Sequence, residues 1–285
     1  MVKIAREISD EIFEMSRDAS NRILNYVASY TFPVYRNNSQ GVPEMVGSGS
    51  LIKFRGMPFF ITAGHVFDLR EDDVPLYYYV AEDKVEYLDR AYETTAFSLQ
   101  NREDDELDIA VIIVNPSNGY PANNFQNKFI PYDMILENSS EINDVRHYLV
   151  GYPLTRNRVV GHEPILNPTA LLWEGGMLKD EAYKKTHLDK EKHILVRFKE
   201  TNVVNAETGE GGMCNLKPRG ISGGGAWAGF GQRDNMGVLQ IEDVRLIGVI
   251  TTHRPEVKAI QCTRIDVALK LADQLLNRLL ETGQL

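Results

Sequence analysis

Short apolar runs separated by turn-forming residues occupy most of the chain, and this feature restricts the fold more than any other. Each run is a few residues long, is rich in Val, Ile, Phe or Tyr, and is bounded by Gly, Pro or Asn. The runs cover residues 31–35, 49–54, 57–62, 77–80, 107–114, 148–152, 169–173, 194–198, 245–251 and 259–263. Many short strands with turn signals between them are typical of an all-β sandwich or barrel. Because long helical patterns do not alternate with these runs, a doubly wound α/β sheet is disfavoured.

Both ends of the chain change to helical spacing. In residues 1–30 the apolar side chains fall roughly on one face of a helix, and residues 9–11 form a plausible helix start. This segment is predicted to be a helix that either packs on the main domain or docks a partner. Residues 265–279 carry a second apolar stripe, and Gly283 follows it as a stop signal, so we expect a C-terminal helix.

Composition excludes several classes of function. Asp and Glu number 40 against 31 Lys and Arg, giving a net charge of −9, whereas phosphate binding needs a basic surface. No apolar run approaches the roughly 18 residues of a membrane span, and the N-terminal residues lack the pattern of a signal peptide. The charge and the short apolar runs lead us to expect that the chain binds neither nucleic acid nor membrane. Because only Cys214 and Cys262 are present, the chain is expected to be cytoplasmic, in a reducing compartment. The redox state of the two cysteines is left open.

Three segments carry residues suited to chemistry. His65 follows an apolar strand and two small residues, Asp108 opens a strongly apolar strand, and Ser222 stands in a glycine-dense turn. Each is weak alone, because a lone His is usually structural, an Asp before a strand is usually a cap, and a Gly-rich turn is often only a turn. Together, and in this order, they are far more specific.

These segments resemble the three active-site motifs of trypsin-like serine peptidases, of the intracellular bacterial type. The matching stretches are Thr62-Ala-Gly-His65, Leu107-Asp108-Ile-Ala-Val and Gly220-Ile-Ser222-Gly-Gly. Lesser matches lie at 47–52, 150–153, 246–251 and 260–265, and the resemblance covers roughly residues 31–280. The chain order His, Asp, Ser is also that of this family.

The resemblance implies an all-β fold of two packed antiparallel six-stranded β-barrels with the site in the cleft between them. The expected domains are an N-terminal helical extension (1–30), a first barrel carrying His65 and Asp108 (31–140), and a second barrel carrying Ser222 (141–285). The second barrel would end in the C-terminal helix.

The chemistry that follows is peptide-bond hydrolysis by a serine endopeptidase through an acyl-enzyme intermediate. His65 would take the proton of the weakly nucleophilic Ser222 hydroxyl, and Asp108 would orient the imidazole. The backbone N–H groups of Gly220 and Ser222 would form the oxyanion hole. No cofactor or metal is expected, since His187 and His193 lack the ligand spacing of a zinc site.

Some positions depart from the family pattern. Ile221 replaces the acid that pairs with a newly cut N-terminus in secreted members, so that activation switch is absent. Leu216 stands at the expected base of the primary pocket, which argues against a preference for Arg or Lys. Thr251, Thr252 and His253 would form the pocket wall, and His253 either favours an acidic or amide side chain or is a rim residue without a role.

Regulation and alternatives remain open at this level. The long segment 179–218, predicted to be largely loop, either covers the cleft or is a plain surface insertion, and a regulatory partner would bind there or at the N-terminal helix.

The chain could instead be a catalytically silent trypsin-like interaction module. Ser222 also fits the Gly-x-Ser-x-Gly elbow of an α/β-hydrolase-type esterase, with Asp234 or Asp243 and His253 as partners. The natural substrate, the oligomeric state and the pathway are not indicated.

Overall fold

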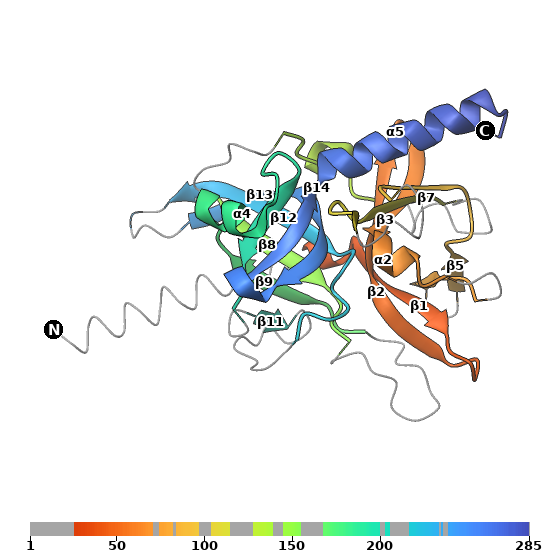
Figure 1. Cartoon of the computed structure of the whole chain (residues 1–285), viewed down its shortest axis with the longest axis horizontal. Helices are drawn as coiled ribbons and strands as arrows, with labels where there is room; N and C mark the ends of the chain where they lie inside the picture. Colours follow the sequence, from red (N-terminus) through yellow and green to blue (C-terminus); the bar gives the residue numbers. More distant parts are fainter. Residues whose placement is uncertain are drawn as a thin grey trace.

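A computed structural model describes residues 26–70, 74–81, 84–96, 104–114, 128–138, 145–154, 168–199, 203–205, 217–233, 235 and 239–284. This part of the chain is mostly β-structure, arranged as two antiparallel sheets that lie side by side (Figure 1). One of the sheets curls into a half-barrel. Within the described residues, no helix is both long enough and apolar enough to cross a membrane.

The first sheet is built from residues 31–113. Its strands are ordered β5-β4-β1-β2-β3-β7-β6, and every pair is antiparallel. Their bounds are β1 (Thr31–Asn37), β2 (Pro43–Phe54), β3 (Met57–Ala63), β4 (Tyr77–Ala81), β5 (Lys84–Tyr87), β6 (Tyr92–Thr94) and β7 (Ile109–Ile113). The pairing of β3 with β7 brings the end of β3, just before His65, beside Ile109, which follows Asp108.

The second sheet is built from residues 146–264, with strand order β10-β14-β13-β12-β8-β9-β11. It contains β8 (Arg146–Gly151), β9 (Leu171–Gly175), β10 (His193–Arg197), β11 (Val203–Asn205), β12 (Gly225–Arg233), β13 (Leu239–Arg254) and β14 (Ala259–Arg264). The long β13 pairs with β12 on one side and β14 on the other, so the residues after Ser222 lead directly into the centre of this sheet.

The expectation of six strands in each barrel is wrong, because within the described part of the chain each sheet has seven strands. The end strands of the first sheet, β5 and β6, are not paired with each other within the described residues, and neither are β10 and β11 of the second. Short edge strands account for the extra members. β6 and β11 have three residues each, too few to form a recognisable alternating pattern.

Among the described residues, the named helices are short except at the C-terminus. They are α2 (Gly64–Phe67), α4 (Asp180–Thr186), α5 (Ile265–Glu281) and the 3-10 turns η2 (Tyr132–Met134) and η4 (Pro255–Val257). The expected C-terminal helix is therefore present as α5. The expected N-terminal helix lies outside the described residues up to residue 25. Residues 26–28 are helical, and the ring of Tyr30 lies 6.3 Å from that of Trp227.

The segment 179–218 contains more regular structure than predicted. It includes α4 and β11 besides the expected strand near residue 194. The helix was missed because its sequence is dense in charge, but the buried Tyr183 anchors it and its hydroxyl accepts a hydrogen bond from the Leu195 N–H at 2.9 Å.

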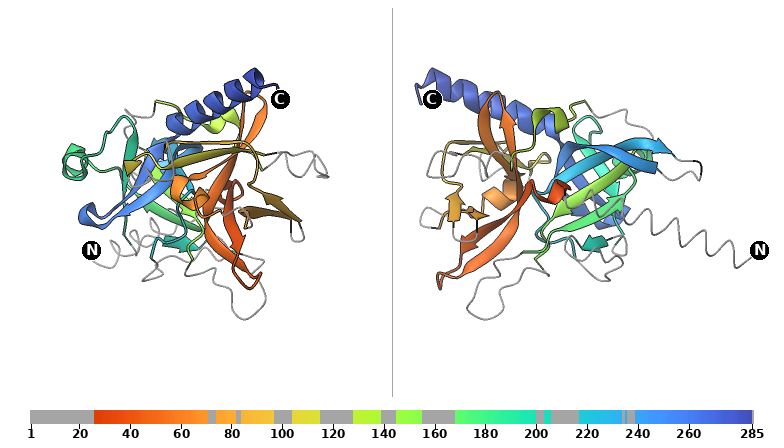
Figure 2. Two further views of the ribbon diagram at one scale, coloured as in Figure 1. Left: turned by 45° about the vertical axis from the view of Figure 1, so that its right-hand side comes forward. Right: turned by 180° about the vertical axis from the view of Figure 1, so that it is seen from behind.

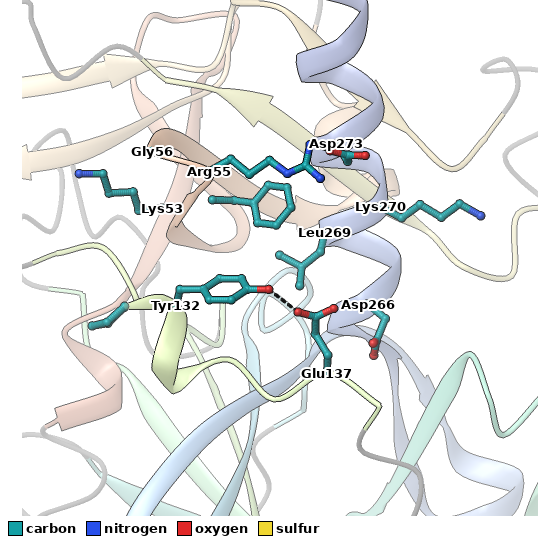
Figure 3. A pocket seen from close by; sticks show the side chains of 11 residues that line it. Lys53, Arg55, Gly56, Tyr132, Glu137, Asp266, Leu269, Lys270 and Asp273 are labelled. Atoms are coloured by element: carbon teal, nitrogen blue, oxygen red, sulfur yellow. Dashed lines mark hydrogen bonds and ion pairs between the residues drawn. The ribbon is translucent and has the colours of Figure 1, made fainter.

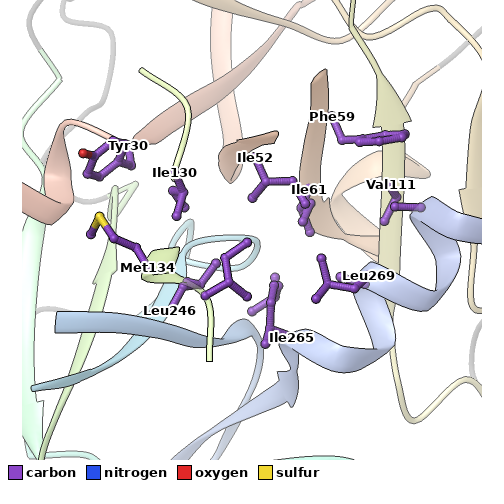
Figure 4. Close-up of a cluster of buried hydrophobic side chains, with 14 of the residues drawn as sticks. Tyr30, Ile52, Phe59, Ile61, Val111, Ile130, Met134, Leu246, Ile265 and Leu269 are labelled. Carbon is purple, nitrogen blue, oxygen red and sulfur yellow. The ribbon is translucent and has the colours of Figure 1, made fainter. Parts of the chain in front are cut away.

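The main core lies between the two sheets and beneath α5. Ile52, Ile61 and Val111 from the first sheet meet Leu246 from the second and Leu269 from α5 (Figure 4). Helix α5 contacts β6 and β7 on one side and β13 and β14 on the other, and Figure 2 shows it lying across the first sheet. Each sheet also has an apolar cluster of its own. This packing fixes the position of one sheet relative to the other. The candidate site contains residues from both sheets, so its geometry depends on this packing.

Candidate active site

His65 stands in the first turn of α2, directly after β3. The N–H of Gly64 donates to the Asp108 carbonyl oxygen at 2.8 Å, so the start of this short helix is fastened to the beginning of β7. The His65 side chain is 45% exposed and is thus accessible to a reacting partner.

Asp108 receives two hydrogen bonds from His65. Its Oδ1 accepts from the His65 backbone N–H at 2.8 Å, and its Oδ2 lies 2.6 Å from His65 Nδ1. A carboxylate can only accept, so Nδ1 carries a proton and donates, which leaves Nε2 of a neutral ring free to accept. Asp108 is 8% exposed and has a left-handed backbone, φ +52°. The structure therefore brings two of the three predicted catalytic residues together in the arrangement that general-base chemistry needs.

Ser222 is half-buried in a tight turn that both sheets hold. From the first sheet, the Ser48 N–H donates to the Ser222 carbonyl oxygen and the Ser48 hydroxyl donates to that of Gly220, both at 2.8 Å. From the second sheet, the Ile250 carbonyl oxygen accepts from the Gly223 N–H at 2.7 Å. The turn thus lies at the junction of the sheets, against the strand that leads to His65.

Gly223 is required by this geometry. Its φ is +86°, and a Cβ built there would lie 1.9 Å from the Ser48 carbonyl oxygen and 2.3 Å from Thr62 Oγ1. Thr62 is three residues before His65, so the turn around Ser222 packs directly on the His65 segment.

The Ser222 hydroxyl is not bonded to His65. Its Oγ donates to the Thr251 carbonyl oxygen at 3.2 Å instead. The backbone turn that carries Ser222 therefore lies against the His65 segment, whereas the Ser222 hydroxyl points toward β13.

The backbone N–H groups predicted to form the oxyanion hole are those of Gly220 and Ser222. Among the hydrogen bonds of the described residues, neither the Gly220 N–H nor the Ser222 N–H acts as a donor. Both belong to the turn between Gly220 (φ +92°) and Gly223, where backbone N–H groups remain available to a ligand.

The predicted pocket residues are only partly placed. Leu216 lies outside the described residues. Thr251 is buried, and its hydroxyl donates to the Gln261 carbonyl oxygen at 3.2 Å. Thr252 is half-buried, and the exposed His253 makes an edge contact with the Phe198 ring at 5.4 Å between centroids.

Sequence reasoning missed several polar residues that hold the site. Ser48 fixes the Ser222 turn, and Gln261 and Thr263 of β14 bond to the chain just before Asp108. Ser48 lies inside the recognised Gly47-Ser-Gly-Ser motif, but nothing local in the sequence marks Gln261 or Thr263.

The described residues contain no group of three or more His, Cys, Asp or Glu side chains able to hold a metal ion. Cys262 is a free thiol and is buried, and burial raises its pKa well above the ordinary value. Cys214, its possible disulfide partner, lies outside the described residues.

A cavity of about 770 Å³ lies between the β2–β3 turn, η2 and α5. Phe54, Tyr132 and Leu269 line it together with charged side chains, and Figure 3 shows the Tyr132 hydroxyl bonded to Glu137. None of His65, Asp108 or Ser222 lines it, so we separate it from the candidate active site.

Comparison with known proteins adds no further assignment. No protein-family model matches the sequence, and no curated protein matches it at a significant level. The geometry of the site therefore has to carry the functional argument.

Proposed function

We propose that this chain is a trypsin-like serine endopeptidase that hydrolyses peptide bonds of a protein substrate through His65, Asp108 and Ser222. The observation that carries the proposal is the double hydrogen bond between Asp108 and His65, at 2.8 and 2.6 Å. A buried carboxylate bound to both the main chain and Nδ1 of an accessible histidine fixes the tautomer that a general base requires.

The reaction begins with rotation of the Ser222 hydroxyl. In the free enzyme Oγ donates to Thr251, and substrate binding turns it toward Nε2 of His65. Catalytic hydrogen bonds are often absent from free enzymes and form only with substrate bound. His65 then takes the hydroxyl proton as Oγ attacks the carbonyl carbon, and the tetrahedral oxyanion forms.

The backbone N–H groups of Gly220 and Ser222 stabilise that oxyanion. The tetrahedral intermediate collapses when His65 gives its proton to the leaving amine, which leaves the acyl group on Ser222. Water, deprotonated by His65, then attacks the ester carbon, and His65 returns the proton to Ser222 Oγ as the acid product leaves. Asp108 stabilises the imidazolium in both halves without itself taking the proton.

The trypsin-like fold is part of the proposal. Its support is that His65 and Asp108 come from one antiparallel sheet and Ser222 from a second. The Ser222 turn leads into β12, which pairs antiparallel with β8 and β13. This disfavours the esterase alternative, because an α/β-hydrolase elbow lies between a strand of a parallel sheet and a helix. We place the chain in the cytoplasm because its sequence has only two cysteines.

A second candidate function is the silent interaction module. One observation favours it, since the Ser222 hydroxyl is bonded to Thr251 and not to His65. A module would keep this bond in the presence of a substrate, whereas an enzyme would break it.

The test is covalent labelling with a fluorophosphonate probe, followed by digestion of a protein such as casein. Wild type should gain one probe on Ser222 by mass spectrometry and should cleave casein. Ser222→Ala should do neither, and His65→Ala should lose turnover by on the order of a million-fold. Ser29→Ala, which removes an exposed hydroxyl bonded only to the Tyr26 carbonyl, should behave as wild type. Folded wild type that neither labels nor cleaves would overturn the enzyme proposal in favour of the module.

A further inference from the structure

The chain just before Asp108 is held by the other sheet. The Leu107 carbonyl oxygen accepts from the Thr263 hydroxyl at 2.6 Å, and the Glu106 carbonyl oxygen accepts from the Gln261 side-chain Nε2 at 3.1 Å. Both donors belong to β14 of the second sheet, whereas Asp108 precedes β7 of the first.

The bond from Thr263 acts on the conformation of Asp108 itself. The Leu107 carbonyl and the Asp108 N–H share one rigid peptide plane, and φ of Asp108 is measured from that plane. On the other side, the Ile109 N–H donates to the Thr95 hydroxyl at 2.9 Å. Asp108 is therefore held by hydrogen bonds on both sides in a left-handed conformation, which is uncommon for a residue other than glycine although Asp tolerates it better than most.

Gln261 is oriented without ambiguity. Its side chain is 1% exposed, and its Oε1 accepts from Arg254 Nε at 2.7 Å. A guanidinium can only donate, so the amide oxygen must face Arg254 and the amide nitrogen must face Glu106.

The amide nitrogen of Gln261 also lies 3.4 Å from Nδ1 of the buried His193. Burial lowers the pKa of His193 to about 4, so its ring is neutral at pH 7. Nδ1 of the neutral ring accepts the second hydrogen of the amide group.

Gln261 also connects to the serine side of the site. Its carbonyl oxygen accepts from the Thr251 hydroxyl, and the Thr251 carbonyl oxygen accepts from Ser222. One residue of β14 is therefore bonded both to the strand that holds the nucleophile and to the loop that holds the acid.

We infer that Gln261 and Thr263 are positioning residues that set Asp108 against His65 and fix the distance between the acid and nucleophile halves of the site. The inference rests on the proposed peptidase function for its kinetic consequence. The hydrogen-bond geometry around His65 can be measured independently of that function. Misplacement of a catalytic group by about 1 Å costs up to about 100-fold in rate.

The experiment compares Thr263→Val, which keeps the shape and removes the hydroxyl, with Thr263→Ser, which keeps the hydroxyl. The first readout is the ¹H resonance of the His65 Nδ1 proton in ¹⁵N-histidine-labelled protein, assigned by its loss in His65→Ala. The second is kcat and KM on a peptide or ester substrate. Thr263→Val should move the resonance upfield and lower kcat by about 10- to 100-fold, with KM changed less than about twofold. Thr263→Ser should restore both.

Gln261→Met should have the same two effects as Thr263→Val. If it does not fold, the Thr263 pair decides the question alone. The matched control is Thr186→Val, which removes a threonine-to-carbonyl bond of 2.9 Å within α4 and should change neither readout.

The two proposals fail differently. An unmoved resonance and an unchanged kcat in Thr263→Val, or equal losses in Thr263→Ser and Thr263→Val, overturn the positioning role. A moved resonance in a protein whose wild type does not label overturns the peptidase and leaves the positioning role standing.

Discussion

The turn that carries Ser222 depends on glycine at two positions. Gly220 and Gly223 both have positive φ, which glycine adopts without strain and a residue with a side chain does not. The turn is bonded to Ser48 of β2 and to Ile250 of β13. Its conformation is therefore held by residues of both sheets.

Gly223→Ala should therefore destabilise the protein more than an ordinary left-handed glycine does. Gly41 is the matched control, since its φ is +74° and no atom lies within 4 Å of a Cβ built there. Gly41→Ala should cost about 1 kcal/mol from its backbone conformation alone. Gly223→Ala adds a backbone clash with Ser48, so its urea midpoint should fall well below that of Gly41→Ala and labelling of Ser222 should be lost. Equal midpoints for the two variants would contradict this account.

At the residue scale, the sequence predicts the reactive groups better than their supports. His65, Asp108 and Ser222 stand in short local motifs, so their types and spacing can be recognised. Gln261 and Thr263 contact Glu106 and Leu107 across more than 150 residues. No local pattern can report a contact of that range. Nor could the sequence tell that the Ser222 hydroxyl bonds to Thr251.

Helix α5 packs against both sheets and holds them together. Its buried face includes Leu269, Leu275 and Leu276, whereas Leu280, in the last turn of the helix, is 65% exposed. The buried face contacts strands of both sheets. Most of the stability of such a helix comes from packing of its apolar face and not from its intrinsic helix propensity.

Leu275→Ala should lower the free energy of unfolding by about 2–5 kcal/mol, because it leaves a cavity at a fully buried position. Leu280→Ala on the same helix should change it by less than about 0.5 kcal/mol. Urea denaturation followed by fluorescence measures both. A small loss in Leu275→Ala would mean that α5 does not contribute to the cohesion of the sheets.

Elements with strong periodicity were predictable and others were not. The α5 stripe and the apolar strands β3 and β7 stand out in the sequence. β12 (Gly225–Arg233) is not among the predicted strands, because it is rich in glycine, which is depleted in strands. It is nonetheless a central strand, since β8 and β13 pair along both of its edges and supply the stability that its own residues lack.

At the scale of the whole molecule, the two sheets form one cooperative unit around the site. Ser48 of the first sheet holds the Ser222 turn, and β14 of the second holds the chain before Asp108, so each sheet supports a candidate catalytic residue of the other.

The stability of this unit should fall on acidification, because two histidines are buried in the second sheet. Burial lowers the pKa of His147 and of His193 to about 4, from about 6.5 in the unfolded chain. Between these values the unfolded state binds protons that the folded state does not. The free energy of unfolding should therefore fall as the pH drops from about 6.5 to about 4, by about 1.4 kcal/mol per pH unit for each histidine.

Urea denaturation at several pH values measures this slope, and variants assign it. His147 is 3% exposed, and neither of its ring nitrogens has a hydrogen-bond partner among the described residues. His147→Phe should remove its share of the slope while keeping a ring in the core. His187→Asn, at an exposed left-handed position, should leave the slope as in wild type. If His147→Phe retained the full wild-type slope, acid sensitivity would have to arise from the carboxylates, and burial of this histidine would not be its cause.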